Sequence, residues 1–308
     1  MLTLYITHST CKMHEMGPGH PECPERLDAI SDQMLASGLI NYVQEMEVPA
    51  PVDDETLIRV HARDYIDRLQ RMVPQQGLAE VDPDTMLNPY SLTAARHAAA
   101  SGVLAVEEIL GGRASTAFCA VRPPGHHAER AKSMGFCFFN NVAVAAAHAL
   151  DRHGLERVAI IDFDVHHGNG TENIFGGDSR VLMCSFFQHP LYPNSGVENV
   201  ADNMVNIPVP AYSRGDVIRK LVEEHWLPRL DAFMPQMIFI SAGFDAHRED
   251  DLAQLGLVED DYAWLTNRLL KVAQTHSAGR IVSMLEGGYN LSALGRSVVA
   301  HVKALAKL

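Results

Sequence analysis

The chain has 308 residues, 47% of them hydrophobic, and a formal net charge of −13 at pH 7. This acidic balance argues against intrinsic nucleic-acid binding, which requires a basic surface, and it is compatible with cationic small substrates or basic peptide tails. Five cysteines without a Cys-x-x-Cys spacing do not form a disulfide framework, and no apolar run approaches the length of a membrane span.

Short apolar runs alternate with helical patterns, which predicts a parallel sheet with helices on both faces. The first run, residues 1–8, lacks the basic start of a signal peptide, so we expect a cytoplasmic protein without membrane contact. Residues 72–91, rich in Pro, Gln, Asp and Asn, are predicted to form a surface loop. We predict further strands at 116–121, 158–161, 236–242 and 280–285, and helices at 93–110, 141–150, 217–233, 260–274 and 292–308, the last with Ser292 as N-cap. Since no linker, charge block or repeat interrupts the chain, we expect residues 1–308 to form one α/β domain, a three-layer α/β/α unit with a mainly parallel central sheet.

Two adjacent histidines follow the strand predicted at 116–121. In the segment RPPGHHAE, residues 122–129, two prolines and a glycine predict a rigid turn with His126 and His127 at its tip. Alone, a His-His pair is more often part of a solvated loop than of a site. The next strand ends decide between these interpretations.

Metal-type ligands follow the strands predicted at 158–161 and 236–242. In DFDVHHGNG, residues 162–170, Asp164 and His166 are two positions apart, and in an extended chain such residues point to the same side. Open α/β sheets place their chemistry at the carboxyl ends of parallel strands, and Asp245 follows the next such strand. Catalytic zinc usually has three nitrogen or oxygen protein ligands and one open position, so Asp164, His166 and Asp245 fit such a site.

The strand predicted at 280–285 ends in Gly287-Gly288-Tyr289. A Gly-Gly-Tyr sequence alone is a weak signal, because most such tyrosines pack or form turns. Here it is the fourth strand end that carries polar chemistry. The chain contains no Gly-x-Ser-x-Gly elbow and no phosphate-binding glycine loop after a strand, so we expect metal-assisted hydrolysis and not a covalent nucleophile.

Six segments closely resemble the histone deacetylase and acetylpolyamine amidohydrolase superfamily, and in particular its class II-like, bacterial-type histone deacetylase-like amidohydrolases. They are GPGHPECPER (17–26), RPPGHHA (122–128), GFCFFNN (135–141), DFDVHHGNG (162–170), SAGFDAH (241–247) and LEGGYN (285–290). The resemblance implies the arginase/deacetylase-like fold. It also implies zinc-dependent hydrolysis of the acetyl amide of N-acetyl-lysine side chains or of related acetylated amines.

The resemblance implies roles for individual residues. Asp164, His166 and Asp245 match the ligands of one catalytic Zn²⁺. His127 matches the general base that takes a proton from water and returns it to the leaving amine. Tyr289 matches the hydroxyl that polarises the substrate carbonyl and stabilises the oxyanion.

The resemblance also implies partners for the two histidines. His126 matches an electrostatic partner that is oriented by Asp162. Asn169 lies where some members have an Asp that hydrogen-bonds the second histidine. Because Asn carries no charge, it should leave His127 less cationic than an Asp would.

Further positions match the substrate tunnel and a structural ion site. Gly135 and Phe136 match one wall of the acyl-lysine tunnel, and Tyr192 is the better candidate for the other wall. Arg26 lies where the family often has an arginine of an internal channel. The residues that match a structural K⁺ site are Asp162, Asp164, His166, Ser185 and Phe186.

The entrance residues determine the substrate, and the sequence leaves several readings open. Asp250 and Asp251 either bind a peptide amide or a polyamine ammonium, or are solvated loop charges. Residues 13–16 are candidates for capping the entrance, and Glu15 is a candidate for a charge that selects polyamines. The substrate is therefore an acetylated lysine peptide, an acetylated polyamine or another small acyl amide. The metal used in the cell and a homo-oligomeric state also stay open.

Two rival functions are disfavoured. Arginase-type chemistry needs a second metal and more carboxylates, whereas this chain has Gly168 and His247 two positions after His166 and Asp245. A catalytically silent acyl-lysine-binding module would not need the tandem histidines and the tyrosine that this chain retains.

Overall fold

The central strands consist of buried, mostly apolar residues. In the computed structural model, which describes residues 2–308, β6 (Val158–Asp162), β9 (Met237–Ala242) and β10 (Ile281–Leu285) are buried at every position, as strands with helices on both faces must be. The other strands of the sheet are β1 (Thr3–Thr7), β2 (Gln44–Glu47), β5 (Thr116–Cys119), β7 (Val181–Gln188) and β8 (Met204–Val209). All eight pair in parallel in the order β2-β1-β5-β10-β9-β6-β7-β8.

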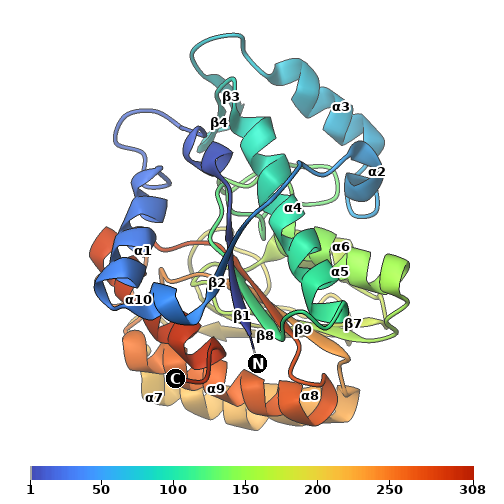
Figure 1. Cartoon of the computed structure of the whole chain (residues 1–308), viewed down its shortest axis with the longest axis vertical. Helices are drawn as coiled ribbons and strands as arrows, with labels where there is room; N and C mark the ends of the chain where they lie inside the picture. Colours follow the sequence, from blue (N-terminus) through green and yellow to red (C-terminus); the bar gives the residue numbers. More distant parts are fainter. Residues whose placement is uncertain (1) are drawn as a thin grey trace.

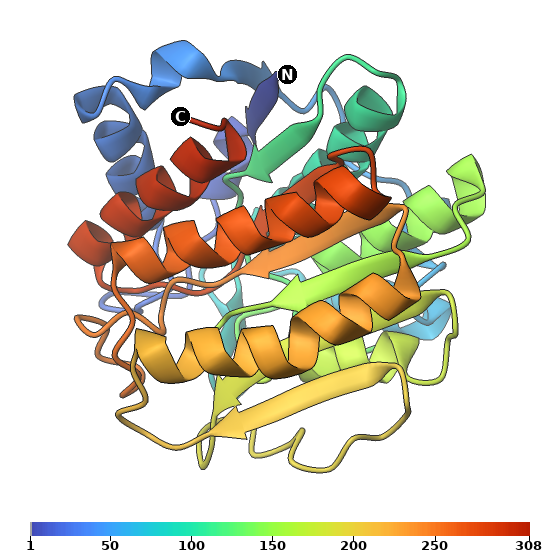
Figure 2. The same ribbon diagram turned by 90° about the horizontal axis from the view of Figure 1, so that it is seen from below.

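Two helical layers cover the sheet (Figures 1 and 2). One layer contains α1 (Glu25–Ala36), α7 (Gly215–Leu221), α8 (Leu227–Phe233), α9 (Glu259–His276) and α10 (Leu291–Leu305). The other contains α4 (Ser91–Leu110), α5 (Asn141–His153) and α6 (Asn169–Phe175). The predicted α/β/α architecture is confirmed.

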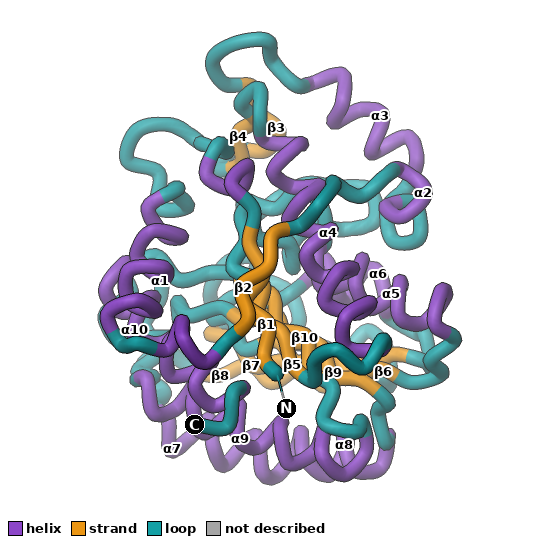
Figure 3. The backbone as a smooth tube through the Cα atoms, viewed as in Figure 1, coloured by secondary structure: helices purple, strands orange, loops and turns teal. Residues whose placement is uncertain are grey.

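Six further elements lie between β1 and α4 in the chain. They are η1 (Ser9–Lys12), η2 (Leu39–Tyr42), α2 (Asp54–Leu57), α3 (Arg63–Met72), β3 (Ala79–Asp82) and β4 (Thr85–Leu87). The hairpin of β3 and β4 lies apart from the central sheet, beside the start of α4 (Figure 3). No helix within residues 2–308 is long and apolar enough to cross a membrane, and all five cysteines are free thiols.

Several predicted boundaries differ from the structure. The N-cap of the last helix is Asn290, whose side chain accepts a hydrogen bond from the backbone N–H of Ala293, so the prediction of Ser292 was wrong. The Ser292 hydroxyl instead accepts a hydrogen bond from Arg296, one turn along the same helix. The helix predicted at 217–233 is α7 and α8 joined by a π-helical turn, Val222–Trp226.

The prediction of a surface loop at 72–91 was also wrong in part. This segment contains the β3–β4 hairpin, in which Thr85 and Leu87 are buried. Its polar composition concealed the few side chains that pack inward. The first predicted strand is β1, and Met1 lies outside the described residues.

Candidate active site

The predicted site segments meet at one edge of the sheet because they follow four neighbouring strands. β5, β10, β9 and β6 are consecutive in the sheet, and their carboxyl ends lie side by side. Asp162, the last residue of β6, is in register with Ser241 of β9. The backbone N–H of Gly287, just beyond β10, donates a hydrogen bond of 2.8 Å to Oδ2 of Asp164. Residues far apart in the sequence therefore surround one point.

Asp164, His166 and Asp245 form a buried cluster of metal-type donors. One ligand atom from each lies within 4.8 Å of the others. Nδ1 of His166 is 3.1 Å from Oδ1 of Asp164 and 3.1 Å from Oδ2 of Asp245. One imidazole and two carboxylates with no thiolate suit a catalytic divalent ion. The structure thus brings together the three residues that the sequence proposed as ligands.

The electrostatics of this cluster fit a cation between the two carboxylates. Burial and the nearby charge of Asp164 raise the pKa of Asp245 to about 7, which reflects the cost of holding two buried negative charges together. Burial opposes a charged His166, but its hydrogen bonds to both carboxylates raise its pKa to about 10. The point between these oxygens therefore favours positive charge, which a divalent ion also supplies.

Two glycines leave the space that the carboxylates occupy. A Cβ atom at Gly287 would lie 2.1 Å from Oδ2 of Asp245, and one at Gly243 would lie 2.0 Å from Oδ2 of Asp164. Both distances are far below van der Waals contact. The glycines of the two motifs are therefore required by the close approach of the Asp245 and Asp164 side chains.

The tandem histidines have partners of different charge. Nδ1 of His126 is 2.9 Å from Oδ2 of Asp162, whereas Nδ1 of His127 is 2.7 Å from Oδ1 of Asn169. Burial opposes a charged His126, but the carboxylates of Asp162 and Asp164 raise its pKa well above the ordinary value. Burial and the adjacent His126 lower the pKa of His127 well below the ordinary value. The surroundings therefore favour the charged form of His126 and the neutral form of His127.

A cavity of about 250 Å³ reaches this cluster at His166. It is lined by Asp84, His127, Gly135, Phe136, His166, Leu191, Tyr192, Leu252 and Tyr289. Gly135, Phe136 and Tyr192, the predicted tunnel residues, all belong to this lining. At Gly135, with φ of 55°, a Cβ atom would lie 2.4 Å from Cδ2 of His127, so a side chain here would push the imidazole aside.

Asp84 is a lining residue that the sequence did not predict. It lies in the turn between β3 and β4, and its carboxylate accepts a hydrogen bond of 2.8 Å from the hydroxyl of Thr85. That hydroxyl accepts a hydrogen bond of 3.0 Å from the backbone N–H of Phe136. His127 and His166 are buried, whereas Asp84 and Tyr192 are partly exposed, so the latter two mark the mouth of the cavity. Within a segment interpreted as a loop, nothing distinguished Asp84 from its acidic neighbours.

Arg26 lies against Tyr289, which lines the cavity. The guanidinium carbon of Arg26 is 5.0 Å from the centre of the Tyr289 ring. Nε of Arg26 donates a hydrogen bond of 2.7 Å to the carbonyl of Gly288, and Nη2 donates one of 2.5 Å to the carbonyl of Glu286. Arg26 therefore fixes the backbone that carries Tyr289. Burial raises the pKa of Tyr289 well above its ordinary value, which keeps its hydroxyl protonated as a donor.

The proposed entrance roles of Asp250 and of residues 13–16 were wrong in part. Asp250 is buried, and its Oδ2 accepts hydrogen bonds from the backbone N–H groups of Tyr289 and Asn290 at 2.6 and 3.0 Å, so it orders this loop and is not free to grip a substrate. His14 is buried against Glu22 and does not cap the entrance. Glu15 and Asp251 are exposed and lie outside the cavity lining. Instead His20 packs its ring 4.7 Å from that of Phe136.

The predicted potassium residues lie on neighbouring strands. Asp162 of β6 and Ser185 of β7 are register partners, and Phe186 follows. The backbone N–H of Asp164 donates 3.1 Å to Oδ1 of Asp162. The five residues are brought together, and the ion stays a prediction.

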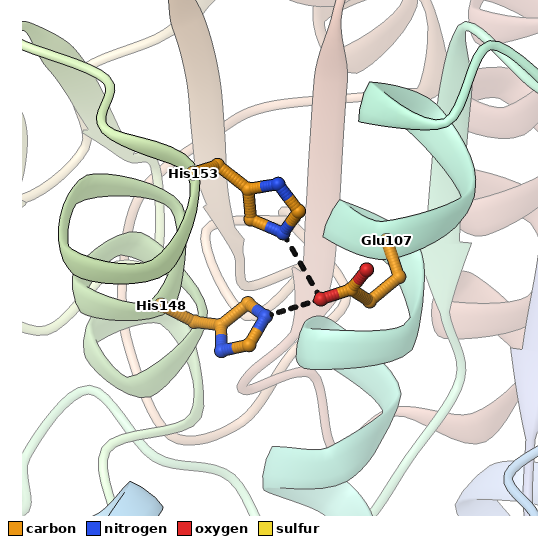
Figure 4. A group of neighbouring side chains, drawn as sticks. All are labelled: Glu107, His148 and His153. Carbon is orange, nitrogen blue, oxygen red and sulfur yellow. Dashed lines mark hydrogen bonds and ion pairs between the residues drawn. The ribbon is translucent and has the colours of Figure 1, made fainter.

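A second group of metal-type donors joins α4 to α5 (Figure 4). Nε2 atoms of His148 and His153 lie 2.7 and 3.0 Å from Oε1 of Glu107. Nη1 of Arg59 donates to Nδ1 of His148 at 3.1 Å, so the proton of this imidazole is on Nε2, where it faces Glu107. A protonated nitrogen offers no lone pair to a metal. We therefore assign this group to helix packing.

The chain matches a family model described as the histone deacetylase domain over residues 20–305. It is 37% identical over 312 residues to the histone deacetylase-like amidohydrolase of Pseudomonas aeruginosa, with 94% of this chain and 82% of that protein covered. It is 35% identical over 298 residues to the probable deacetylase of Archaeoglobus fulgidus, with 94% and 82% covered.

A solved structure has the same fold. The crystal structure of the HDA15 HD domain superposes with a TM-score of 0.93 at 32% identity, covering 99% of this chain and 88% of that chain. An uncharacterized protein of Synechocystis sp. is 40% identical over 298 residues, with 95% of both chains covered. The resemblance inferred from six sequence segments is confirmed over nearly the whole chain.

Proposed function

The chain belongs to the histone deacetylase family, and from this membership we propose that it is a zinc-dependent amidohydrolase that removes acetyl groups from lysine side chains or related acetylated amines. One observation carries the proposal. The buried donors of Asp164, His166 and Asp245 lie together, and His166 lines a cavity that is also lined by His127 and Tyr289. A metal site, a base and an oxyanion donor on one cavity are what amide hydrolysis requires.

The three donors would hold the zinc ion. Bound there, it would supply Lewis acidity that polarises the amide carbonyl and acidifies water. Asp164 and Asp245 would compensate its charge. The backbone N–H groups of Gly287 and Val165 fix these carboxylates by donating to Oδ2 of Asp164 and Oδ1 of Asp245 at 2.8 and 2.9 Å.

His127 is the proton carrier in this proposal. Its Nδ1–H donates to Asn169, which leaves a lone pair on Nε2. A neutral imidazole accepts a proton from the attacking water at Nε2 and later returns it to the leaving amine. His126, held cationic by Asp162, stabilises negative charge beside it. Tyr289 donates its protonated hydroxyl to the developing oxyanion.

The cavity supports a slender substrate. Phe136 and Tyr192 line its outer part and suit the apolar methylene chain of an acylated lysine or polyamine. Asp84 lies at the mouth of the cavity. Its carboxylate can accept hydrogen bonds from the N–H groups that lie beyond the methylene chain in either substrate. We further propose a structural K⁺ bound by oxygen atoms of Asp162, Asp164, His166, Ser185 and Phe186, because oxygen ligands suit hard cations.

The test compares kcat/KM of the zinc-loaded protein on an acetyl-lysine peptide and on an N-acetylated polyamine. Tyr289→Phe should lower kcat on the order of 10²–10³-fold, because one oxyanion donor is lost. Tyr212→Phe is the matched control, since Tyr212 is exposed and its hydroxyl contacts Gln254. Failure of the wild-type protein to cleave either substrate would overturn the proposed function.

A further inference from the structure

Glu129 contacts Asn169, the hydrogen-bond partner of His127. Oε1 of Glu129 lies 2.8 Å from Nδ2 of Asn169, and Oδ1 of Asn169 lies 2.7 Å from Nδ1 of His127. We propose that Glu129 is a positioning residue, which fixes the amide orientation of Asn169 and thereby the tautomer of His127. The proposal deepens the function proposed above and rests on it for its kinetic consequence.

The direction of this chain of hydrogen bonds follows from the chemistry of its end members. The two ends of an Asn amide are nearly the same in shape, so shape alone does not determine which of them faces the imidazole. A carboxylate only accepts hydrogen bonds. Glu129 therefore draws the Nδ2 group of Asn169 toward itself, and the sulfur of Met134, 3.3 Å away, is a weaker second acceptor for that group. The carbonyl oxygen of Asn169 then faces His127.

The orientation of Asn169 determines which nitrogen of His127 carries the proton. A neutral imidazole has one N–H, and a carbonyl oxygen beside Nδ1 places it there. Nε2 then presents its lone pair to the cavity. If the amide were reversed, its N–H would donate to Nδ1, the proton would move to Nε2, and His127 would be unable to accept a proton from water. In a catalytic Ser-His-Asp triad, replacing the carboxylate beside the histidine with an amide favours the wrong tautomer of that histidine and strongly lowers the rate.

His126 shows why a relay is used at this position. His126 contacts the carboxylate of Asp162 directly. A carboxylate in direct contact favours the charged form of an imidazole, whereas a general base must be neutral before the reaction. With Asn169 in between, Glu129 acts on the tautomer of His127 through an uncharged amide, so it does not place its charge against the imidazole.

Glu129 is held in place on the far side of Asn169. Its backbone N–H donates a hydrogen bond of 2.9 Å to the carbonyl of Lys132. Glu129 also lines a second cavity of about 470 Å³, together with Lys132 and Glu172. The position of Glu129 thus does not depend on the substrate cavity, and its role can be tested separately from substrate binding.

The experiment uses Glu129→Gln in the zinc-loaded protein. Because the Gln amide both donates and accepts, it no longer dictates the orientation of Asn169. We expect the imidazole ¹⁵N signals of His127, assigned by their loss in His127→Ala, to change from the Nδ1–H pattern toward Nε2–H. We also expect kcat to fall at least about tenfold with KM nearly unchanged, as for a lost hydrogen bond to a charged group. Unchanged ¹⁵N signals together with unchanged kcat would overturn the proposal.

Two further variants separate positioning from a general charge effect. Glu172→Gln removes a carboxylate that lines the same second cavity and is bonded to Asn206, and it should leave the His127 signals and kcat as they are. In an Asn169→Asp background the side chain at 169 has no reversible amide, so adding Glu129→Gln should no longer lower kcat. An equal loss from Glu172→Gln, or an undiminished loss in the Asn169→Asp background, would refute the relay. The ¹⁵N readout needs no turnover, so an inactive wild-type protein with the expected signals would overturn the proposed function alone.

Discussion

Gly287→Ala is the sharpest test of the proposed metal site, because the added atom meets both of its proposed carboxylate ligands. Its Cβ would lie 2.1 Å from Oδ2 of Asp245 and 2.6 Å from Oδ2 of Asp164, whereas ordinary contact begins near 3.4 Å. The oxygen of Asp245 must therefore retreat by more than an ångström. Metal–oxygen bonds tolerate deviations of only about 0.2 Å. The variant should lose at least one ligand while every ligand residue is still present.

We expect zinc affinity to fall at least about 100-fold, the upper end of the range for changes that displace or misorient ligands. Competition with a chromophoric zinc chelator measures this affinity directly. The control is Gly154→Ala at the end of α5, where φ is 66° and a Cβ meets nothing within 4 Å. That substitution should lower the free energy of unfolding by about 1 kcal/mol through backbone strain and leave zinc affinity unchanged. Equal zinc affinity of Gly287→Ala and the wild-type protein would refute the assignment of the ligands.

Three other predictions use different readouts. Asp84→Asn should lower kcat/KM on an acetyl-lysine peptide about tenfold, since the loss of the carboxylate weakens hydrogen bonds at the cavity mouth; equal values for both proteins would argue against a substrate contact. Burial lowers the pKa of His301 from 6.5 to about 3, so the unfolded state binds more protons and the contribution of this residue to stability is full above pH 6.5 and declines as the pH falls toward 3. Between pH 6.5 and 5 this amounts to roughly 2 kcal/mol, and urea unfolding at both pH values should show a flatter pH dependence for His301→Gln. Mass spectrometry under native conditions should find one zinc per chain in the wild-type protein and in Glu107→Gln with His148→Ala, and none in Asp245→Ala; loss of zinc from the first variant would contradict our assignment of that group.

The site was predictable where local spacing carries the information. Asp164 and His166 share a side because they are two residues apart at the end of a strand, and β6 was recognisable from its apolar run. Asp245 and Tyr289 followed from the same rule applied to β9 and β10, because parallel neighbours end at one edge. Each inference needed only the pattern of one segment and the general geometry of a parallel sheet.

Residues that act through distant packing were not predictable in the same way. Asp84 reaches the cavity because Thr85 links its turn to Phe136, a contact across 51 positions of sequence. Asp250 lies in a sequence typical of a solvated loop. Its buried carboxylate nevertheless accepts hydrogen bonds from three backbone N–H groups, including those of Tyr289 and Asn290. The sequence shows which groups are polar, and only the fold shows which of them have their hydrogen bonds already satisfied.

A second buried network explains why the N-terminal segment is part of the site. Glu22 accepts hydrogen bonds from both Arg122, which precedes the tandem histidines, and Arg26, which holds the loop of Tyr289. Burial opposes the charge of Glu22, but these two guanidinium groups and His14 outweigh it and lower the pKa of the carboxyl. Replacing one member would leave an uncompensated charge in the interior, which typically costs several kcal/mol. His127 at one strand end and Tyr289 at another are therefore tied to one anchoring carboxylate, so the distance between them is set by the fold before any substrate enters.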